Sequence, residues 1–290
     1  MLKFIHFGDL HVWRKTPMWS ELYYPKRWLG PLNLYVHRAK HFPPAYRQAA
    51  LDEICREKPD VAVFTGDFSS FSLKTEFTEA AKLFAPLREL LGERLFAIPG
   101  NHDCYTPRAY RNQVLEKVLP WVHSEPVSRL DLSEKLTLLG VNHSIPFLLH
   151  SNGKVTPETQ EALKMAFEQT TAEGRKVLLA GHFSYDSPSA YPETTTHKLL
   201  GHTEFADLIQ HYKPLLYMHG HQHVRWAFSS PQTPDTLCLN CGSVGMKHEH
   251  PNKQAGFVSW SQAEDGTIKN LTAHTFNGKD AWAKTPLARS

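Results

Sequence analysis

The segment Leu95-Phe96-Ala97-Ile98-Pro99-Gly100-Asn101-His102-Asp103 carries the clearest indication of how the chain folds. It starts as a short apolar run, typical of a buried strand, and Pro99 and Gly100 end that run. Apolar runs followed by glycine and polar side chains occur at four more places: Gly8-Asp9-Leu10-His11, Gly66-Asp67, Gly181-His182 and Gly220-His221-Gln222-His223. The chain therefore repeats one arrangement, a predicted strand with candidate functional side chains directly after it.

The apolar runs alternate with segments of helical character. We expect strands at 2–7, 61–65, 95–98, 136–141, 177–180 and 215–218, and helices at 45–58, 76–91, 158–172 and 203–211. Thr156, Pro157 and Gly174 are typical of the start and end of the third helix. Such alternation favours an α/β fold with parallel strands. Strand-like pieces at 226–228, 236–239, 257–260 and 268–273 are expected to extend the sheet, so that residues 1–290 form a single domain.

Composition excludes several classes of protein. The chain has 290 residues, 41% hydrophobic and 21% charged, with a net charge of +3, which is typical of a globular protein and not of a disordered or coiled-coil chain. His6, Asp9 and His11 argue against a secretory signal at the start. The longest stretch without charged residues, 136–153, contains polar residues and does not resemble a membrane span. We expect a cytoplasmic protein.

The polar residues after the strands predict a metal site. The chain has 18 histidines, the commonest metal ligands. The seven candidate ligands follow predicted strands, whose carboxyl ends would share one edge of a sheet: Asp9, His11, Asp67, Asn101, His182, His221 and His223. Any one of them could be an ordinary polar residue at a strand end. Together they exceed the ligand set of one catalytic ion and favour two ions, the usual arrangement for phosphoryl chemistry.

The five segments, in this order, resemble the motifs D-x-H, G-D, G-N-H-D, G-H and G-H-x-H of the calcineurin-like metallophosphoesterases. The resemblance spans residues 9 to 223. It implies a four-layer α/β/β/α sandwich of two mixed sheets, with the metal site at the carboxyl ends of the strands. It also implies a metal-dependent hydrolase of phosphoric esters or anhydrides, in which the metal ions supply an activated water.

The resemblance assigns a role to each matching position. Asp9, His11 and His223 would hold one ion. Asn101, His182 and His221 would hold the other, and Asp67 would bridge the two. His102 would face the phosphate, to stabilise the transition state or protonate the leaving oxygen, and Asp103 would orient the His102 ring. We expect two divalent ions and favour Mn, although Fe, Zn, Co and Ni also suit this ligand set.

Residues 12–47 form an insertion of different character. The segment has seven basic residues, one acidic residue and eight aromatic residues, so its net charge is +6 and that of the remaining chain is −3. One interpretation is a surface segment whose aromatic side chains pack on the body. The other is a cap beside the site, which would contact an anionic membrane or single-stranded nucleic acid. The total charge does not favour a large nucleic-acid surface, so we expect no nucleic-acid partner.

The insertion also bears on the substrate. Residues 26–33 are similar to a segment of bacterial relatives with a hydrophobic cap, the UDP-2,3-diacylglucosamine pyrophosphatases of lipid A synthesis. Candidate substrate-binding residues are Arg14, Lys26, Arg27 and Trp28. We expect a small phosphorylated substrate, lipid-linked on this hypothesis, with peripheral contact at the inner face of a membrane. The alternatives are a cyclic-nucleotide or other small phosphodiesterase, a nuclease or protein phosphatase, and a non-catalytic metal-binding scaffold. The sequence leaves the oligomeric state open.

Overall fold

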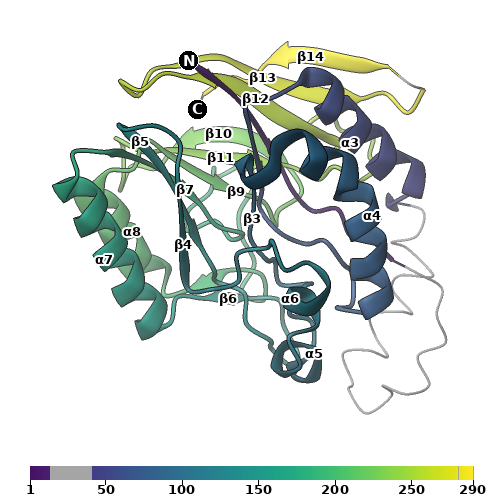
Figure 1. The fold of residues 1–290 in the computed structure, drawn as a ribbon, viewed down its shortest axis with the longest axis horizontal. Coiled ribbons are helices and arrows are strands. Elements are labelled where there is room, and N and C mark those ends of the chain that lie inside the picture. Colours follow the sequence, from purple (N-terminus) through teal and green to yellow (C-terminus); the bar gives the residue numbers. More distant parts are fainter. Residues whose placement is uncertain (14–40, 280, 290) are drawn as a thin grey trace.

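The computed structural model describes residues 1–13, 41–279 and 281–289. Two six-stranded mixed sheets form the centre of the molecule (Figure 1). The strands of the first sheet, in spatial order, are β14 (Trp282–Pro286), β13 (Ile268–Phe276), β12 (Gly256–Gln262), β1 (Leu2–Phe7), β2 (Val61–Phe64) and β3 (Leu95–Ala97). The strand β1 is parallel to β2 and antiparallel to β12. This sheet therefore joins the start of the chain to its end.

The second sheet is built from the middle of the chain. Its strands, in spatial order, are β10 (Arg225–Ser229), β11 (Leu237–Cys241), β9 (Leu216–His219), β7 (Lys176–Ala180), β5 (Leu136–Val141) and β4 (Val127–Asp131). The central strands β5, β7, β9 and β11 are parallel, and β4 and β10 are antiparallel to their neighbours at the edges. A short parallel pair, β6 (Gly153–Lys154) and β8 (Leu199–Leu200), lies apart from both sheets.

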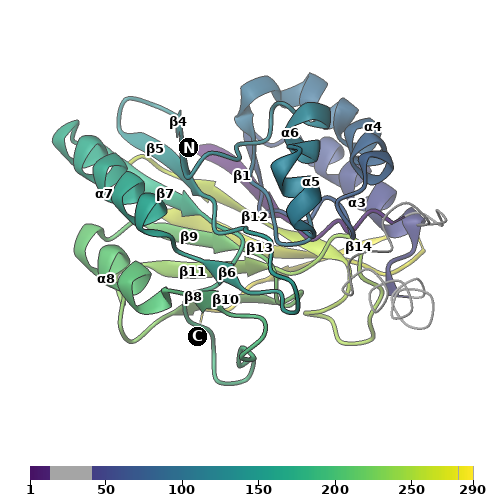
Figure 2. The same ribbon diagram turned by 90° about the horizontal axis from the view of Figure 1, so that it is seen from below.

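Helices cover the outer face of each sheet (Figures 1 and 2). The helices α3 (Pro44–Glu57) and α4 (Lys74–Leu91) pack on the first sheet, and α7 (Pro157–Ala172) and α8 (His202–Tyr212) pack on the second. A third apolar cluster joins the inner faces of the two sheets, with Phe4 and Trp260 from one and Leu178 and Met218 from the other. The fold is the predicted four-layer α/β/β/α sandwich.

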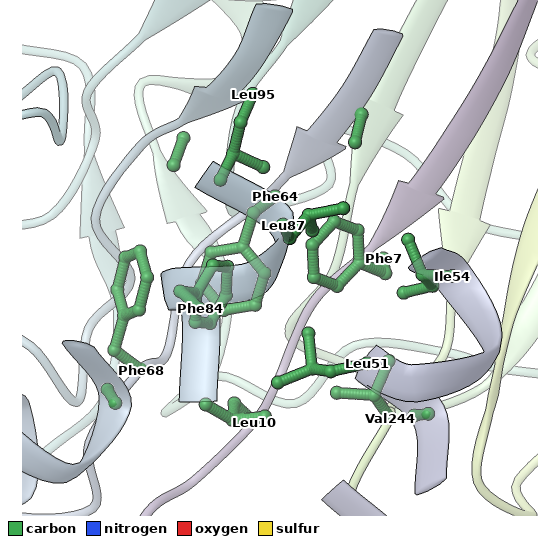
Figure 3. Packing of buried hydrophobic residues seen from close by; sticks show 14 of the residues in the cluster. Phe7, Leu10, Leu51, Ile54, Phe64, Phe68, Phe84, Leu87, Leu95 and Val244 are labelled. Carbon is green, nitrogen blue, oxygen red and sulfur yellow. The ribbon is translucent and has the colours of Figure 1, made fainter. Parts of the chain in front are cut away.

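The core beneath the first sheet holds the backbone from which the site is built. Figure 3 shows Phe7, Phe64 and Phe84 packed together, with Leu10 and Val244 in the same cluster. Leu10 is fully buried between two candidate ligands in the chain, so its side chain anchors the loop after β1. Val244 follows Ser243, whose hydroxyl donates a hydrogen bond to the Asp9 carbonyl over 2.7 Å. Apolar packing therefore positions two backbone segments at the carboxyl end of this sheet.

Most predicted elements are present, and several short ones were not predicted. The Thr156 hydroxyl accepts a hydrogen bond from the Thr159 amide at the start of α7, and Gly174 beyond its end has a φ of +69°, as predicted. The elements missed are η3 (Gly92–Arg94), α5 (Pro107–Arg111), α6 (Val114–Val118), β4, β6, β8 and β14. These are short, and their residues lack a helical or alternating apolar pattern. Among the described helices, none combines the length and the apolar character needed to cross a membrane.

Candidate metal centre

The seven candidate ligands meet at the carboxyl ends of the strands. Asp9 and His11 follow β1, Asp67 follows β2 and Asn101 follows β3. From the second sheet, His182 follows β7, and His221 and His223 follow β9. The site therefore lies where the two sheets contribute loops to one edge, as the sequence pattern predicts.

Four of these residues form a compact group. One ligand atom from each residue lies within 4.8 Å of the other three, and the residues are Asp9, His11, Asp67 and His223. His11 Nε2 is 2.9 Å from His223 Nε2 and 3.6 Å from Asp67 Oδ2, and His223 Nε2 is 3.1 Å from Asp9 Oδ1. Two donors bound to one ion at about 2.1 Å are about 3.0 to 3.4 Å apart, depending on the coordination angle. The observed separations therefore fit the edges of a coordination shell.

The chemistry of these atoms supports the same conclusion. Asp9 Oδ1 is buried and has no hydrogen-bond partner among the residues that the structure describes. A buried carboxylate oxygen without a donor is costly unless a cation satisfies it. His11 Nε2 and His223 Nε2 face each other at 2.9 Å, and a cation between them could bind the lone pairs of both nitrogens. The group fits a divalent cation.

Among the other candidate ligands, His182 also contacts Asp67, and Asn101 contacts His182. His182 Nε2 is 3.0 Å from Asn101 Oδ1 and 3.5 Å from Asp67 Oδ2. His182 Nδ1 donates to the Thr65 carbonyl over 2.6 Å, which leaves Nε2 as the ligand nitrogen. In the same way, His221 Nε2 donates to the His197 carbonyl over 3.2 Å and leaves Nδ1 for an ion. Asp67 reaches both groups, the position that the predicted bridging role requires.

The backbone at these positions is strained. Five of the seven candidate ligands have left-handed backbone conformations, with φ of +55° at Asp9, +48° at His11, +65° at Asp67, +69° at His221 and +54° at His223. Positive φ is uncommon outside glycine and costs about 1 kcal/mol or more per residue. Such strain is concentrated at functional sites, because the surrounding structure must enforce it.

Two glycines allow the loops to approach. A Cβ atom at Gly100 would lie 2.2 Å from Asp67 Oδ1, and one at Gly220 would lie 2.5 Å from Asp9 Oδ2. Next to Gly220, the His221 amide donates a hydrogen bond to Asp9 Oδ2 over 3.1 Å. The glycine in each motif is therefore needed so that neighbouring loops can contact the candidate ligands.

The structure corrects the predicted role of Asp103. The Asp103 carboxylate accepts hydrogen bonds from the backbone amides of Asp67, Phe68, Ser69 and Gly100 at 2.9 to 3.2 Å. It therefore fastens the loops after β2 and β3 to each other. The orientation of the His102 ring comes instead from Ser70, whose carbonyl accepts a hydrogen bond from His102 Nδ1 over 2.8 Å.

His102 lies beside the first group of ligands. Its ring is perpendicular to that of His11, with 4.8 Å between the ring centroids, and it stacks on Tyr105. The His102 amide donates to Asp67 Oδ1 over 2.8 Å. The residue thus sits at the candidate bridging carboxylate, with its ring directed by Ser70 and not by Asp103.

Carboxylates and histidines of the site shift one another's pKa values. Burial would raise the pKa of Asp67, but His182, His102 and His11 hold it well below its usual value. Burial would lower the pKa of His182, but Asp67 and Asp9 outweigh it and raise that pKa to about 9. Burial and the Asp67 carboxylate raise the pKa of Asp103 to about 7, against its backbone hydrogen bonds. A site that stabilises a proton on a buried histidine also stabilises a metal cation.

Both ends of the predicted insertion lie next to the site. Phe42 contacts the rings of His11 and His223, with centroid distances of 5.0 and 5.7 Å. Trp13 Nε1 donates to the Phe42 carbonyl over 2.9 Å, and the buried Arg47 donates to the His11 carbonyl over 2.9 Å. The candidate substrate residues lie outside the described residues: Arg14, Lys26, Arg27 and Trp28.

Several residues that contact candidate ligands were not predicted, among them Thr65, His197 and Phe42. Thr65 and His197 orient the rings of His182 and His221 through their carbonyls, and Phe42 packs on His11 and His223. A carbonyl contact leaves no mark on residue identity, so Thr65 and His197 carry no sequence signal. Phe42 does carry one, as an aromatic residue at the end of the insertion.

Comparison with known proteins agrees with this architecture. The family model for calcineurin-like phosphoesterases matches residues 2–225. Among solved structures, a dimetal phosphatase from Danio rerio has a TM-score of 0.61 at 10% identity, with 94% of each chain covered. A purple acid phosphatase from yellow lupin seeds has a TM-score of 0.64 at 12% identity, covering all of this chain and 54% of that one. The anchor protein of the inner membrane complex of Plasmodium has a TM-score of 0.50 at 14% identity, covering 99% and 88%.

A search of curated proteins found no match. At identities this low, the structural similarities establish the fold alone. The family match covers more than three quarters of the chain and agrees with the five motifs and the grouped ligand atoms. The chain therefore belongs to the calcineurin-like phosphoesterases, a family of hydrolases that act on phosphoesters with two divalent metal ions.

Proposed function

We propose that the protein hydrolyses a phosphodiester or pyrophosphate bond at this centre. The observation that carries the proposal is the pair of ligand groups that both contact Asp67. Asp9, His11 and His223 would hold one ion, and Asn101, His182 and His221 would hold the other. Mn is the metal we propose, because hard oxygen and imidazole ligands without cysteine suit it.

Charge supports an anionic substrate. Asp9 and Asp67 supply two negative charges, and two divalent ions would bring four positive ones. When bound, the ions would polarise the phosphoryl oxygens and lower the pKa of a coordinated water. The charge of the ions would thus exceed that of the Asp9 and Asp67 carboxylates, and the remaining positive charge would attract a phosphate.

His102 is our candidate for proton transfer. Its Nδ1 proton is held by the Ser70 carbonyl, so the imidazolium form of the ring would donate its Nε2 proton to a leaving oxygen and return to the neutral form. Its contacts with His11 and Asp67 support this role. Asp103 contributes by fixing the loop that carries His102.

For the substrate, we favour a nucleotide-linked lipid of the UDP-2,3-diacylglucosamine type. The aromatic and basic composition of residues 12–47 supports this choice, since acyl chains need apolar surface and a diphosphate needs positive charge. Phe42, near the end of that segment, lies against His11 and His223, which supports a role of the segment at the site. On this proposal the protein acts in the cytoplasm and contacts an anionic membrane peripherally. A cyclic-nucleotide or other small phosphodiesterase is the alternative.

A hydrolysis panel tests the proposal. Protein reconstituted with Mn, Fe, Zn, Co or Ni would be assayed on UDP-diacylglucosamine, cAMP, bis-p-nitrophenyl phosphate and single-stranded DNA, with and without EDTA. Metal-dependent cleavage of the lipid nucleotide alone supports the full proposal. Cleavage of cAMP or of the generic diester, without cleavage of the lipid nucleotide, keeps the phosphodiesterase and excludes the lipid substrate. Two bound ions without any turnover would favour the non-catalytic scaffold.

A further inference from the structure

A cavity of about 560 Å³ lies next to the metal centre. Its walls come from the loop between β7 and β8, from the segment after β9 and from the loop before β12, and they include Tyr191, Glu193, His221, Gln222, Val224 and Lys253. We call it the 190–197 pocket. Its volume lies in the range of small-molecule sites. His221 is both a candidate ligand and part of the wall, so the pocket lies beside the metal centre.

Gln222 projects into this pocket with weakly satisfied donors. Its Nε2 is 3.4 Å from both the Tyr191 carbonyl and Glu193 Oε1, at the long limit of hydrogen bonding. Its Oε1 accepts from Trp226 Nε1 over 3.1 Å, which fixes the amide so that its NH2 group faces the loop. Gln222 therefore offers donors that a ligand can engage better than the present acceptors do.

Glu193 adds a second polar group without adding strong charge. Burial and the nearby Asp186 raise its pKa to about 8, against the effect of Lys198. At neutral pH the carboxyl group is thus mostly protonated and can both donate and accept. Tyr191 and Val224 supply aromatic and apolar wall next to these groups. The pocket suits a flat, uncharged group with donors and acceptors on its edge.

We propose that the 190–197 pocket binds the nucleobase of the substrate, with Tyr191 as the stacking surface and Gln222 and Glu193 as the groups that hydrogen-bond to its edge. The inference rests on the proposed function, because the phosphate at the metal centre brings the base to the pocket. Tyr191 and Glu193 are specificity-determining residues for that reaction.

The loop that forms the pocket also contacts the metal centre. The His197 carbonyl accepts the hydrogen bond from His221 Nε2, and the His197 ring lies 5.9 Å from the His221 ring. His197 Nδ1 is in turn 3.0 and 2.9 Å from the hydroxyls of Thr194 and Thr196. The wall of the pocket and a candidate ligand thus belong to one hydrogen-bonded unit, which fixes the distance between base and phosphate.

Two chromogenic diesters test the proposal. The p-nitrophenyl ester of thymidine 5′-phosphate and methyl p-nitrophenyl phosphate release the same leaving group, but only the first carries a nucleobase. For the metal-loaded protein we expect kcat/KM to be at least about tenfold higher on the nucleoside ester. Tyr191→Ala and Glu193→Leu should each remove most of this preference, by about tenfold, and change the methyl ester less than about twofold. Glu204→Gln, an exposed acid on α8, is the matched control and should change neither.

The outcomes separate the two proposals. Equal rates on both esters, unchanged in the variants, would overturn the nucleobase pocket and leave hydrolysis intact. Failure to cleave either ester would overturn the proposed function and the pocket with it. A second readout does not depend on turnover: saturation-transfer NMR of thymidine with metal-free protein should show binding that Tyr191→Ala abolishes. Absence of that signal in the unmodified protein would also overturn the inference.

Discussion

Replacement of Gly100 by alanine tests whether the loop contacts control the metal centre. An alanine Cβ at this position would lie 2.2 Å from Asp67 Oδ1 and 2.5 Å from the Asp67 amide. Contacts to real Cβ atoms are essentially never shorter than 3.0 Å, so Asp67 must move by at least 0.8 Å. The φ of Gly100 is not positive, so the backbone of residue 100 itself tolerates alanine. The predicted effect is therefore purely steric.

The size of the effect follows from that displacement. Misplacement of a reacting group by about 1 Å can lower the rate by about 10²-fold. We expect Gly100→Ala to lose about 10²-fold in kcat/KM on bis-p-nitrophenyl phosphate, equivalent to about 2.7 kcal/mol. Metal content, measured by mass spectrometry after dialysis, should fall below two ions per chain. Crowding of the packed loop should also lower the free energy of unfolding by about 1 to 3 kcal/mol.

Gly174→Ala provides the matched control. Gly174 has a φ of +69°, and a Cβ atom at this position would meet no other atom within 4 Å, so alanine there strains the backbone without touching the site. It should cost about 1 to 2 kcal/mol of stability and leave activity and metal content unchanged. If Gly100→Ala binds two ions and retains more than about a fifth of the activity, the argument that the Gly100 loop positions Asp67 is refuted.

Three further predictions concern other residues. Asp67→Asn keeps the oxygen that accepts the hydrogen bond from the His102 amide but loses the negative charge of the bridging carboxylate. Circular dichroism should show that the variant stays folded, while bound metal and turnover are both lost. Full activity would make the site assignment wrong. His102→Ala should retain both ions and lose about 10²- to 10⁴-fold in kcat, and loss of metal instead would identify His102 as a ligand. Glu57 pairs with Lys3 and Lys284, which lower its pKa to about 2, against burial, from 4.5. The contribution of Glu57 to the free energy of unfolding is present above about pH 4.5 and is lost as the pH falls towards 2. In urea unfolding, Glu57→Gln should therefore cost about 1 kcal/mol of stability at pH 7 and little at pH 2. An equal cost at both pH values would contradict the ion-pair explanation.

The residue types and their order predict the main features of the fold. Regular alternation of apolar runs and helical segments indicates the parallel strands, and β1 matches its predicted bounds. The polar residues after five strands come together because the carboxyl ends of parallel strands share an edge. These features depend on side-chain identity and spacing, which a sequence displays directly.

The geometry of the site depends on backbone contacts that a sequence does not display. The predicted role of Asp103 is wrong because most partners of its carboxylate are backbone amide groups, which nearly every residue has. The left-handed conformations at Asp9 and His11 and the carbonyl acceptors of His182 and His221 are invisible in the sequence for the same reason. The 190–197 pocket arises from a loop without regular structure, where no periodic pattern exists to predict it.

The position of β1 in its sheet has a consequence for synthesis on the ribosome. β1 emerges first, and β2 can pair with one of its sides early, but its other side pairs with β12, which ends at residue 262. Until β12 has been synthesised, the nascent chain therefore carries an unpaired strand edge beside the loop that bears Asp9 and His11. Exposed edges of this kind promote association between chains. Completion of this sheet thus has to wait for β12, and chains that stop before β12 are expected to aggregate.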